Sequence, residues 1–234
     1  MLFLLLASGG NNESLGERLG NAFMPAKVRF FGLEVSPSFV SAVFISVFLM
    51  LLALVLYFTV VRKLKKIPGR LQSFLEMAVG TFDKIAGEQT HEFSGFVGPY
   101  IFTAAIFICI GTLVELVGIR PIFSGINASV ALGLTTFFLI NIFALKRKGL
   151  VKRIGRYKNP ILIVTDLSVP LSLSIRLFGS VTSGFLIMEM LYFSLATSLV
   201  VPAFVSVITT LMHAFVQAYV FALLTSLFIG EAIE

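Results

Sequence analysis

The chain has 234 residues, of which 57% are hydrophobic and 25 are phenylalanine, and its formal net charge is +6. This composition excludes a soluble globular domain, because no soluble domain of this length keeps so much apolar surface away from water. Most of the 18 Lys and Arg residues lie in two short clusters beside apolar stretches, which indicates membrane topology rather than nucleic-acid binding. We therefore predict an all-α integral membrane protein with about five spans of roughly 20 residues each. The single cysteine, Cys109, excludes disulfides and thiolate metal sites.

The first part of the chain contains one apolar segment and one amphipathic segment. We predict that residues 1–36 form an N-terminal tail outside the membrane and that residues 39–61 form the first span. A basic cluster follows this span and marks its cytoplasmic end; it consists of Arg62, Lys63, Lys65 and Lys66. In residues 71–93 apolar side chains recur every three or four positions, which predicts an amphipathic helix on the inner membrane surface.

The middle of the chain contains a second and a third span. They are predicted at residues 96–117 and 128–145 and are joined by a short turn with few charges. A second basic cluster begins at Lys146. If both basic clusters lie inside, successive spans alternate in direction and the N-terminus lies outside.

The last part of the chain predicts two helices that are longer than a simple crossing requires, at residues 160–193 and 201–230. Helices of that length must tilt or lie partly along the membrane, so we expect a long tilted hairpin. The C-terminus is then cytoplasmic. We interpret residues 37–234 as a single membrane domain.

One arginine lies in the middle of the first long helix. Arg176 has no Asp or Glu within nine residues on either side. A guanidinium stays charged in a protein, and placing it in the hydrocarbon layer costs several kcal/mol unless it faces a partner or water. Function is therefore the default interpretation of Arg176. The structural alternative is an arginine that only binds a carbonyl or extends to the interface.

Small residues recur at helical spacing around this arginine. The set consists of Ser172, Gly179, Ser180, Ser183 and Gly184. Small side chains let another helix approach closely, and static helix packing is the more common reason for such a stripe. Together with Arg176 they describe a fixed positive charge in a shallow groove, against which a partner helix with an acidic residue can slide.

Two motifs, in the same order, resemble a known family. The segment Pro170-Leu-Ser-Leu-Ser-Ile-Arg-Leu-Phe-Gly179 is similar to the signature of the a subunit of F-type ATP synthases. The segments Gln217-Ala-Tyr-Val-Phe-Ala-Leu-Leu-Thr225 and Ile229-Gly-Glu-Ala232 are similar to the closing helix of that family. Weaker similarity extends through Thr112-Leu-Val-Glu-Leu-Val117 and Leu71-Gln-Ser-Phe-Leu-Glu76. The resemblance implies the fold described above, with the two long helices against a ring of c subunits.

The resemblance also implies a mechanism. It suggests an ion-conducting stator subunit of a rotary ATP synthase, in which Arg176 separates two half-channels and releases a proton or sodium ion from each passing c-subunit carboxylate. Attraction between a guanidinium and a carboxylate strengthens in a low-dielectric site. Gly179, Ser183 and Gly184 would face the c ring. The implied partners are the c ring, the peripheral-stalk b subunits, the lipid bilayer and the catalytic head, which holds the ATP-handling sites.

The last helix carries a polar stripe in an otherwise apolar segment. The stripe consists of Ser206, Thr210, His213 and Gln217. These residues recur every three or four positions and share one helix face, which predicts a wet or hydrogen-bonded ion pathway. Gln217 occupies the glutamine position of the family and is expected beside Arg176. Ser172 and Ser180 on the preceding helix are further candidates for this pathway.

The chain departs from the pattern of many bacterial family members at three positions. Ser180 stands where Asn is usual, Phe185 where a carboxylate or His is usual, and Thr210 where His or Glu is usual. The usual acid–imidazole pair is therefore absent from its places. We predict that Glu189 and His213 replace it as separate stations of the outer half-channel.

The expected register of the hairpin separates these two residues. With Arg176 opposite Gln217, His213 lies near Ser180, and Glu189 lies farther along, closer to the channel mouth. For His213 alone, a hydrogen bond to a neighbouring Ser or Thr is the alternative to a channel role.

Two other carboxylates are candidates for the ion pathway. Glu115 lies near the outer end of the second span, where the family often has an acidic residue, and a solvent-facing interface residue is the equal alternative. Asp166 precedes Arg176 by ten residues and is a candidate for the inner half-channel.

Two other classes of protein stay open. An ion-coupled secondary transporter is disfavoured by the few spans and by the absence of an inverted repeat, and a structural scaffold would pair Arg176 with an acid that does not move. The sequence contains no zinc motif, nucleotide-binding loop or nucleophile–base set, so we predict no cofactor, no metal, no nucleic-acid partner and no covalent chemistry.

The predicted location is a bacterial plasma membrane rather than an organelle inner membrane, because mitochondrial members of the family generally have His at the position of Phe185.

Overall fold

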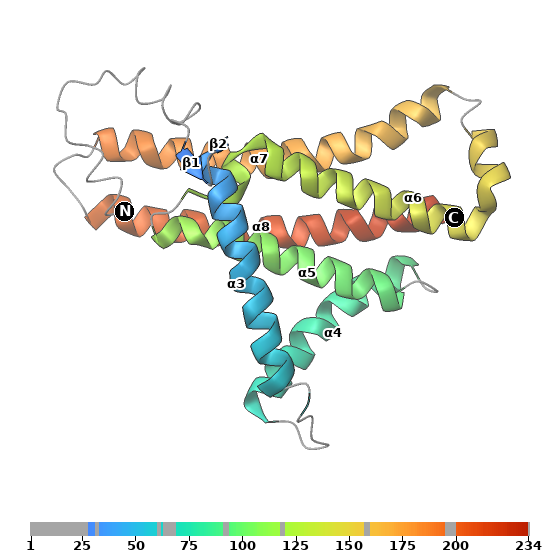
Figure 1. The fold of residues 1–234 in the computed structure, drawn as a ribbon, viewed down its shortest axis with the longest axis horizontal. Helices are drawn as coiled ribbons and strands as arrows, with labels where there is room; N and C mark the ends of the chain where they lie inside the picture. The colour runs from blue at the N-terminus through green and yellow to red at the C-terminus, as the bar shows by residue number, and fades with distance from the viewer. Residues whose placement is uncertain are drawn as a thin grey trace. The chain divides into compact units, whose positions relative to one another are not determined.

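The computed structural model describes residues 28–30, 33–59, 62, 69–90, 94–117, 120–156, 160–194 and 200–233 (Figure 1). These residues form a short β-hairpin, six α-helices and two short 3-10 helices. In chain order the elements are β1 (Val28–Phe30), β2 (Leu33–Val35), α3 (Pro37–Thr59), α4 (Arg70–Thr90), α5 (Ser94–Leu113), η3 (Val114–Val117), η4 (Ile122–Ser124), α6 (Ile126–Arg156), α7 (Pro160–Ser194) and α8 (Val200–Ile233). Most of the predicted N-terminal tail lies outside the described residues.

These helices confirm an all-α membrane fold. Within the described residues, four segments are long and apolar enough to cross a membrane; they are Pro37–Thr59, Gly95–Val117, Ile126–Arg147 and Phe204–Ile233. The fifth predicted span, residues 160–193, forms the helix α7. Its described part is not among the four segments, because Arg176 and several Ser and Gly residues lower its apolar character.

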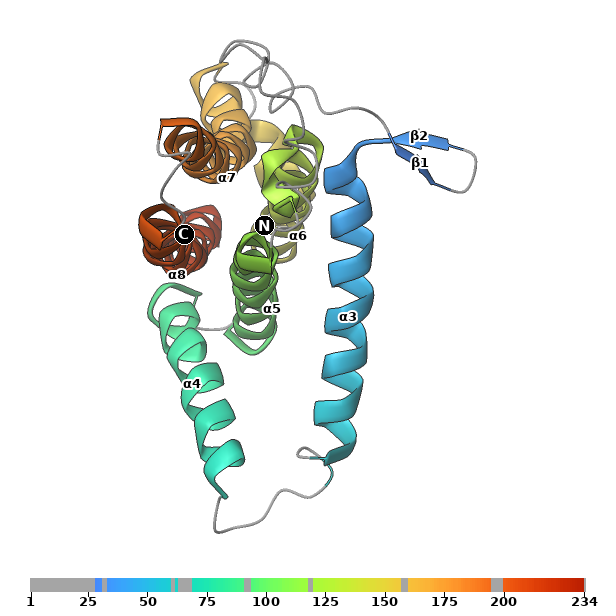
Figure 2. The same cartoon turned by 90° about the vertical axis from the view of Figure 1, so that its left-hand side faces the viewer.

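A β-hairpin that the sequence did not indicate precedes α3. Strands β1 and β2 pair antiparallel, with Val28 opposite Val35 and Phe30 opposite Leu33. Figure 2 shows this hairpin beside the first turn of α3. The hairpin adds a small ordered element to the segment that was predicted only as an outer tail.

Helix α6 is longer than the third predicted span. The apolar stretch ends near residue 145, but the helix continues through the second basic cluster to Arg156. Lys and Arg favour helices almost as well as the best helix formers do. The end of an apolar stretch therefore limits the lipid-facing part of α6 and does not end the helix.

The chain forms two compact units. Unit 1 comprises Met1–Ile45, Ile108–Ala131 and Ser174–Gln217, and unit 2 comprises Ser46–Phe107, Leu132–Leu173 and Ala218–Glu234. Helices α3, α5, α6, α7 and α8 each contribute residues to both units. Most of the candidate site residues fall in unit 1.

Unit 1 is held together by the start of α3, the turn between α5 and α6, and parts of α7 and α8. The buried side chains of α3 are Ser38, Ser41 and Ile45, and the Ser38 and Ser124 hydroxyls lie 3.1 Å apart in a hydrogen bond. The side chains of Ile122 and Phe123 are fully buried. A Cβ at Gly111 would lie only 3.0 Å from Ile122 Cδ1, so a glycine there lets the turn pack closely on α5.

Unit 2 is built around an apolar cluster to which α4, α5, α6 and α8 contribute. The buried members of this cluster are Ala86, Val97, Ile101, Ile140, Phe143, Ala144, Ala222, Ile229 and Ala232. The hydroxyl of Ser226 on α8 donates a 2.8 Å hydrogen bond to the Ile85 carbonyl on α4. One turn later α8 packs closely on the α4 backbone, where a Cβ on Gly230 would lie 2.8 Å from the Gln89 carbonyl oxygen.

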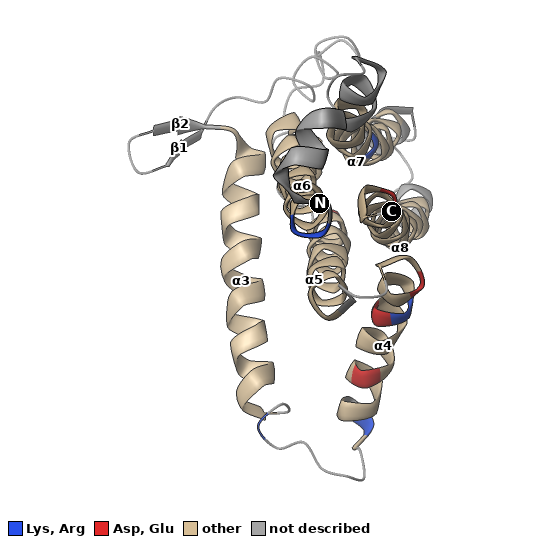
Figure 3. Ribbon diagram, turned by 90° about the vertical axis from the view of Figure 1, so that its right-hand side faces the viewer, with Lys and Arg blue, Asp and Glu red and all other residues tan. Residues whose placement is uncertain are grey.

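Helix α4 confirms the predicted amphipathic helix. Charged residues are concentrated on it in Figure 3, while Ala86 is fully buried in the apolar cluster of unit 2. Toward its first turns, Phe74 and Met77 are 68% and 69% exposed. Such a pattern of exposed apolar and charged side chains suits the membrane interface, and its position on the inner surface stays a prediction.

Candidate functional site

Arg176 lies on an exposed face of α7. Its neighbour Ile175 is 58% exposed, and Gly179 and Ser183, about one and two turns farther along, are exposed as well. The opposite face of the helix is packed, since Leu177 and Val181 are buried. Among the residues that the structure describes, no carboxylate forms an ion pair with Arg176.

The surface beside the arginine has little side-chain bulk. A Cβ added at Gly179 would meet no atom within 4 Å. The hydroxyl of Ser183 donates to the carbonyl oxygens of Gly179 and Ser180, at 2.7 and 3.1 Å, and so turns back onto its own helix. One face of α7 therefore carries Arg176, Gly179 and Ser183. This face is open to another molecule, and the Ser183 hydroxyl on it is already bonded to its own helix.

Helices α7 and α8 are joined in unit 1 by a hydrogen bond between Ser180 and Gln217. The Ser180 hydroxyl lies 3.2 Å from the amide oxygen of Gln217 and 3.3 Å from the carbonyl of Leu177. A hydroxyl has a single hydrogen, so these two acceptors share it. Gln217 is only 7% exposed, which makes Ser180 an important partner for its amide.

The register of the two helices differs from the prediction by one turn. The sequence analysis placed Gln217 opposite Arg176 and His213 near Ser180. The structure pairs Gln217 with Ser180 and lays His213 against Gly184, where an added Cβ would lie 3.7 Å from the imidazole Cε1. Helical periodicity identifies the face of a helix, but it does not fix the axial shift between two helices, which depends on how their side chains interlock.

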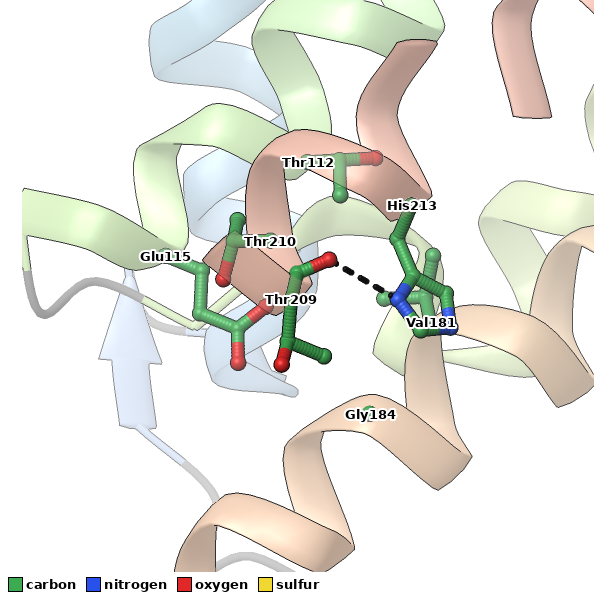
Figure 4. A pocket seen from close by; sticks show the side chains of 7 residues that line it. All are labelled: Thr112, Glu115, Val181, Gly184, Thr209, Thr210 and His213. Carbon is green, nitrogen blue, oxygen red and sulfur yellow. Dashed lines mark hydrogen bonds between the residues drawn. The ribbon is translucent and has the colours of Figure 1, made fainter. Parts of the chain in front are cut away.

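A small polar pocket lies within unit 1 (Figure 4). It is lined by Thr112, Glu115, Val181, Gly184, Thr209, Thr210 and His213. These residues come from α5 and η3, from α7 and from α8. The structure therefore brings together Glu115, His213 and Thr210, which the sequence analysis had proposed separately.

The imidazole of His213 has a defined orientation in this pocket. Its Nδ1 lies 3.0 Å from the Thr209 carbonyl oxygen, one turn earlier on the same helix, as the dashed line in Figure 4 shows. A carbonyl oxygen can only accept a hydrogen bond, so Nδ1 carries the hydrogen and Nε2 is left for other partners.

The carboxylate and one hydroxyl in the pocket have unused hydrogen-bonding capacity. Thr210 is 3% exposed, and within the described part of the chain neither its hydroxyl nor the Glu115 carboxylate makes a hydrogen bond or ion pair. Thr112 differs, because its hydroxyl donates to the Ile108 carbonyl at 2.9 Å. Glu115 is only partly buried, and the open groups of Glu115 and Thr210 both line the pocket, so they are free to bind water or an ion there.

The remaining candidates are not part of this pocket. Ser206 is partly buried on α8, and Ser172 is partly buried on α7 within unit 2. Glu189 and Asp166 belong to the helix α7, but their side chains lie outside the described residues, as does the side chain of Phe185. Their predicted roles stay predictions.

Three pocket residues were not foreseen. Thr112 and Thr209 carried a usable signal, because Thr112 is one helical turn before Glu115 and Thr209 is adjacent to the polar stripe on α8. Val181 carried none, since nothing distinguishes it from the other apolar residues of α7. In the part of the chain that the structure describes, no group of three or more His, Cys, Asp and Glu side chains is placed to hold a metal.

The fold and the site together define a multi-pass membrane protein with an uncovered arginine on one helix and a polar pocket between neighbouring helices. The sequence comparisons agree with that class and make it specific. The chain belongs to the ATP synthase A chain family, whose pattern matches residues 42–230.

Individual relatives support the same assignment. ATP synthase subunit a 3 of Pelobacter propionicus is 32% identical over 213 residues, which cover 86% of this chain and 91% of the relative. ATP synthase subunit a of Geotalea daltonii is 30% identical over 194 residues, covering 78% of this chain and 83% of the relative. The subunit a of Geobacter sulfurreducens is 29% identical over 184 residues, covering 74% and 79%.

Proposed function

We propose that this chain is the ion-conducting stator subunit of a rotary ATP synthase and that Arg176 controls ion exchange with a ring of c subunits. The observation that supports this proposal most is the exposed guanidinium beside Gly179 and Ser183. In a hydrocarbon layer such a charge needs a partner or water. A passing helix with a carboxylate supplies that partner, and small residues beside Arg176 let it come close.

The proposed mechanism follows from the permanent charge of arginine. When a c-subunit carboxylate comes near Arg176, attraction in a low-dielectric site favours its deprotonated form, and the bound ion leaves. Because the guanidinium does not give up its own proton, it blocks direct passage between two half-channels. Ions then cross only by riding on the ring, and rotation drives ATP synthesis in the catalytic head.

We assign the polar pocket to the outer half-channel. Its open carboxylate and hydroxyl supply groups that an ion can use on the way to the ring. Glu189 is proposed nearer the channel mouth, Gln217 and Ser180 nearer the ring, and Asp166 in the inner half-channel.

The assembly and topology complete the proposal. The partners are the c ring, the peripheral-stalk b subunits and the catalytic head, and the location is a bacterial plasma membrane. The chain is a single membrane domain over residues 37–234, with residues 1–36 outside and the C-terminus in the cytoplasm. This orientation rests on the two basic clusters, which mark the inner side.

Replacement of Arg176 tests the mechanism. In the assembled complex in sealed vesicles, Arg176→Ala should abolish ion-driven ATP synthesis, because the ring carboxylates no longer release their ions at this site. Arg176→Lys should restore little, since an ammonium group can deprotonate and lacks the fork geometry. Arg70→Ala on α4, an exposed arginine outside the site, is the matched control and should support normal synthesis. Normal coupled synthesis by the Arg176→Ala complex would exclude the proposed mechanism.

A further inference from the structure

The second half of helix α3 is exposed on every side. After Ile45 none of its described side chains is buried. Successive residues of a helix point in directions about 100° apart, and the three successive residues Leu51, Leu52 and Ala53 are all exposed. Within the described residues, no other part of the chain therefore covers this half of α3.

The composition of this half fits lipid acyl chains better than another helix. Contacts between membrane helices favour small residues, and the only small side chains in residues 46–59 are Ser46, Ala53 and Thr59. The exposed face of α7 differs, since it carries Gly179 and Ser183. Large, flexible apolar side chains on all sides of α3 match the hydrocarbon of a lipid.

Two arginines lie where α3 ends and α4 begins. Arg62 follows α3, and Arg70 is the first residue of α4. Both are exposed, and neither forms an ion pair with another described residue. Figures 1 and 2 show the end of α3 and the start of α4 at the same end of unit 2. The sequence between the two arginines adds further cations, which lie outside the described residues; they are Lys63, Lys65 and Lys66.

No acidic residue close in the sequence offsets this positive charge. The chain contains no Asp or Glu between Glu34 and Glu76. The Glu76 carboxylate already accepts a 2.8 Å hydrogen bond from the side-chain amide of Gln72. An anion from outside the chain is therefore needed to balance the charge of Arg62 and Arg70.

The side chain of Arg62 is arranged to bind a phosphate group. Its guanidinium carbon lies over the Phe58 ring, 5.4 Å from the ring centroid, within the range of a cation–π interaction. A ring engages the flat face of a guanidinium, so the N–H donors at its edge stay available for oxygen atoms. Two parallel N–H donors match the geometry of a phosphate.

We infer that the end of α3 and the start of α4 form a binding site for an anionic phospholipid. The phosphate pairs with Arg62 and Arg70, and the acyl chains lie along the exposed half of α3. Phe74 and Met77 on α4, at 68% and 69% exposed, add apolar surface. A zwitterionic lipid also has a phosphate, but its ammonium group cancels the charge, so the site prefers anionic headgroups. The site does not involve Arg176 and is independent of the ion exchange proposed above.

Photoreactive phospholipids test this site. The assembled complex is placed in phosphatidylcholine vesicles that contain equal small amounts of two probes, phosphatidylglycerol and phosphatidylcholine, each with a photoreactive acyl chain. Labelling of residues 46–77 by each probe is then quantified by mass spectrometry. The phosphatidylglycerol probe should label this segment about tenfold more than the phosphatidylcholine probe. Arg62→Gln and Arg70→Gln should each lower this preference by about fivefold, the effect of one cation near an anionic headgroup.

Three further variants separate a built site from general charge attraction. Lys84→Gln removes an exposed cation from a later turn of α4 and should leave the preference unchanged. Phe58→Leu keeps both arginines and an apolar contact but removes the ring beneath the guanidinium, so the preference should fall by about twofold or more. Arg62→Lys should fall between the unaltered complex and Arg62→Gln, because an ammonium group keeps the charge without the fork.

The readout is a ratio of two probes on the same complex, so a variant that assembles poorly lowers both signals and leaves their ratio intact. Equal labelling by the two probes in the unaltered complex would overturn the inference. An equal loss of preference in Lys84→Gln and Arg62→Gln would do the same, since it would show only attraction between a charged surface and the membrane. Absence of label from both probes would show that another protein subunit covers α3 in place of lipid.

Discussion

The two units of the chain bury different kinds of side chain along the same helix. In unit 1, α8 contributes Thr210 and His213 to a polar pocket and hydrogen-bonds α7 through Gln217. In unit 2, α8 buries Ala222 and Ile229 in an apolar cluster. A continuous helix thus lines a polar pocket before residue 217 and joins an apolar cluster after it, where it also buries Thr225 and Ser226.

This difference separates the requirements of stability from those of function. Polar groups between helices cost free energy unless each finds a partner, and hydrogen bonds between membrane helices return only about 0.6 kcal/mol on average. Small and apolar side chains give closer packing without that cost. The apolar cluster of unit 2 has the packing that stability favours, although α8 also buries Thr225 and Ser226 there. The polar groups of the unit 1 pocket are explained by the ion pathway proposed for it.

The largest effect on stability is expected where α8 packs against the backbone of α4 in unit 2. Gly230→Ala would place a Cβ 2.8 Å from the backbone oxygen of Gln89, so α4 and α8 must move apart. We expect the free energy of unfolding to fall by about 1–3 kcal/mol, the usual cost of overpacking. The measurement is the thermal unfolding midpoint of the purified complex in detergent, together with the amount of chain recovered from membranes.

Gly87→Ala is the matched control for this substitution. Gly87 also lies in unit 2, and an added Cβ there would meet no atom within 4 Å. Since alanine favours a helix over glycine, the midpoint should stay the same or rise slightly. Equal midpoints for the two variants would contradict the close packing of α4 on α8.

A smaller effect is expected from the two hydrogen bonds between helices, and it should be greater in unit 1. Ser180→Ala removes the described partner of the Gln217 amide oxygen and should cost about 1 kcal/mol, because a buried acceptor is left unpaired. Tyr100→Phe in unit 2 should cost about 0.5 kcal/mol. The Tyr100 and Thr136 hydroxyls are 2.7 Å apart, but Thr136 also donates to the Leu132 carbonyl, so Tyr100→Phe leaves no donor unpaired.

Chemical denaturation of both variants in mixed micelles measures this contrast. Thr136→Val serves as the control for Tyr100→Phe. Because the two residues share one hydrogen bond, the Tyr100→Phe/Thr136→Val double variant should lose no more stability than the sum of the two single losses. A larger loss in Tyr100→Phe than in Ser180→Ala would reverse the comparison of the two units.

The smallest effect on stability is expected at Gly179. An added Cβ has no neighbour within 4 Å in the described chain, so Gly179→Ala should change the free energy of unfolding by less than about 0.5 kcal/mol. Under the proposed function, however, the methyl group faces the c ring beside Arg176. We expect slower ion-driven ATP synthesis at unchanged stability, and normal synthesis would place the ring on another surface.

The sequence predicted the helices well and their mutual arrangement poorly. Apolar runs and Pro or basic residues located the helices to within a few residues in most cases, because length and apolarity are local properties. The exception is the end of α6, where Lys and Arg continue the helix beyond the lipid. The hairpin β1–β2 was missed because its pattern is short.

In the candidate site, too, single residues could be predicted from the sequence, but contacts between helices could not. Arg176 could be identified from its chain neighbours alone, because an arginine in an apolar helix is unusual wherever its partners lie. The combination of Glu115 with His213 could not, since it depends on how η3 packs against α8. The one-turn error in the register of Gln217 has the same origin: spacing defines a helix face, and only tertiary packing sets the shift between two faces.

Helix α3 is attached to the rest of the chain near its beginning. Beyond Ile45, none of its described side chains is buried, while Ser38 is held by its hydrogen bond to Ser124. A mismatch between helix length and bilayer thickness costs only fractions of a kcal/mol per Å. We therefore expect α3 to change its tilt when lipid composition alters the thickness of the bilayer. Such changes would be taken up by this helix before they disturb the surroundings of Arg176.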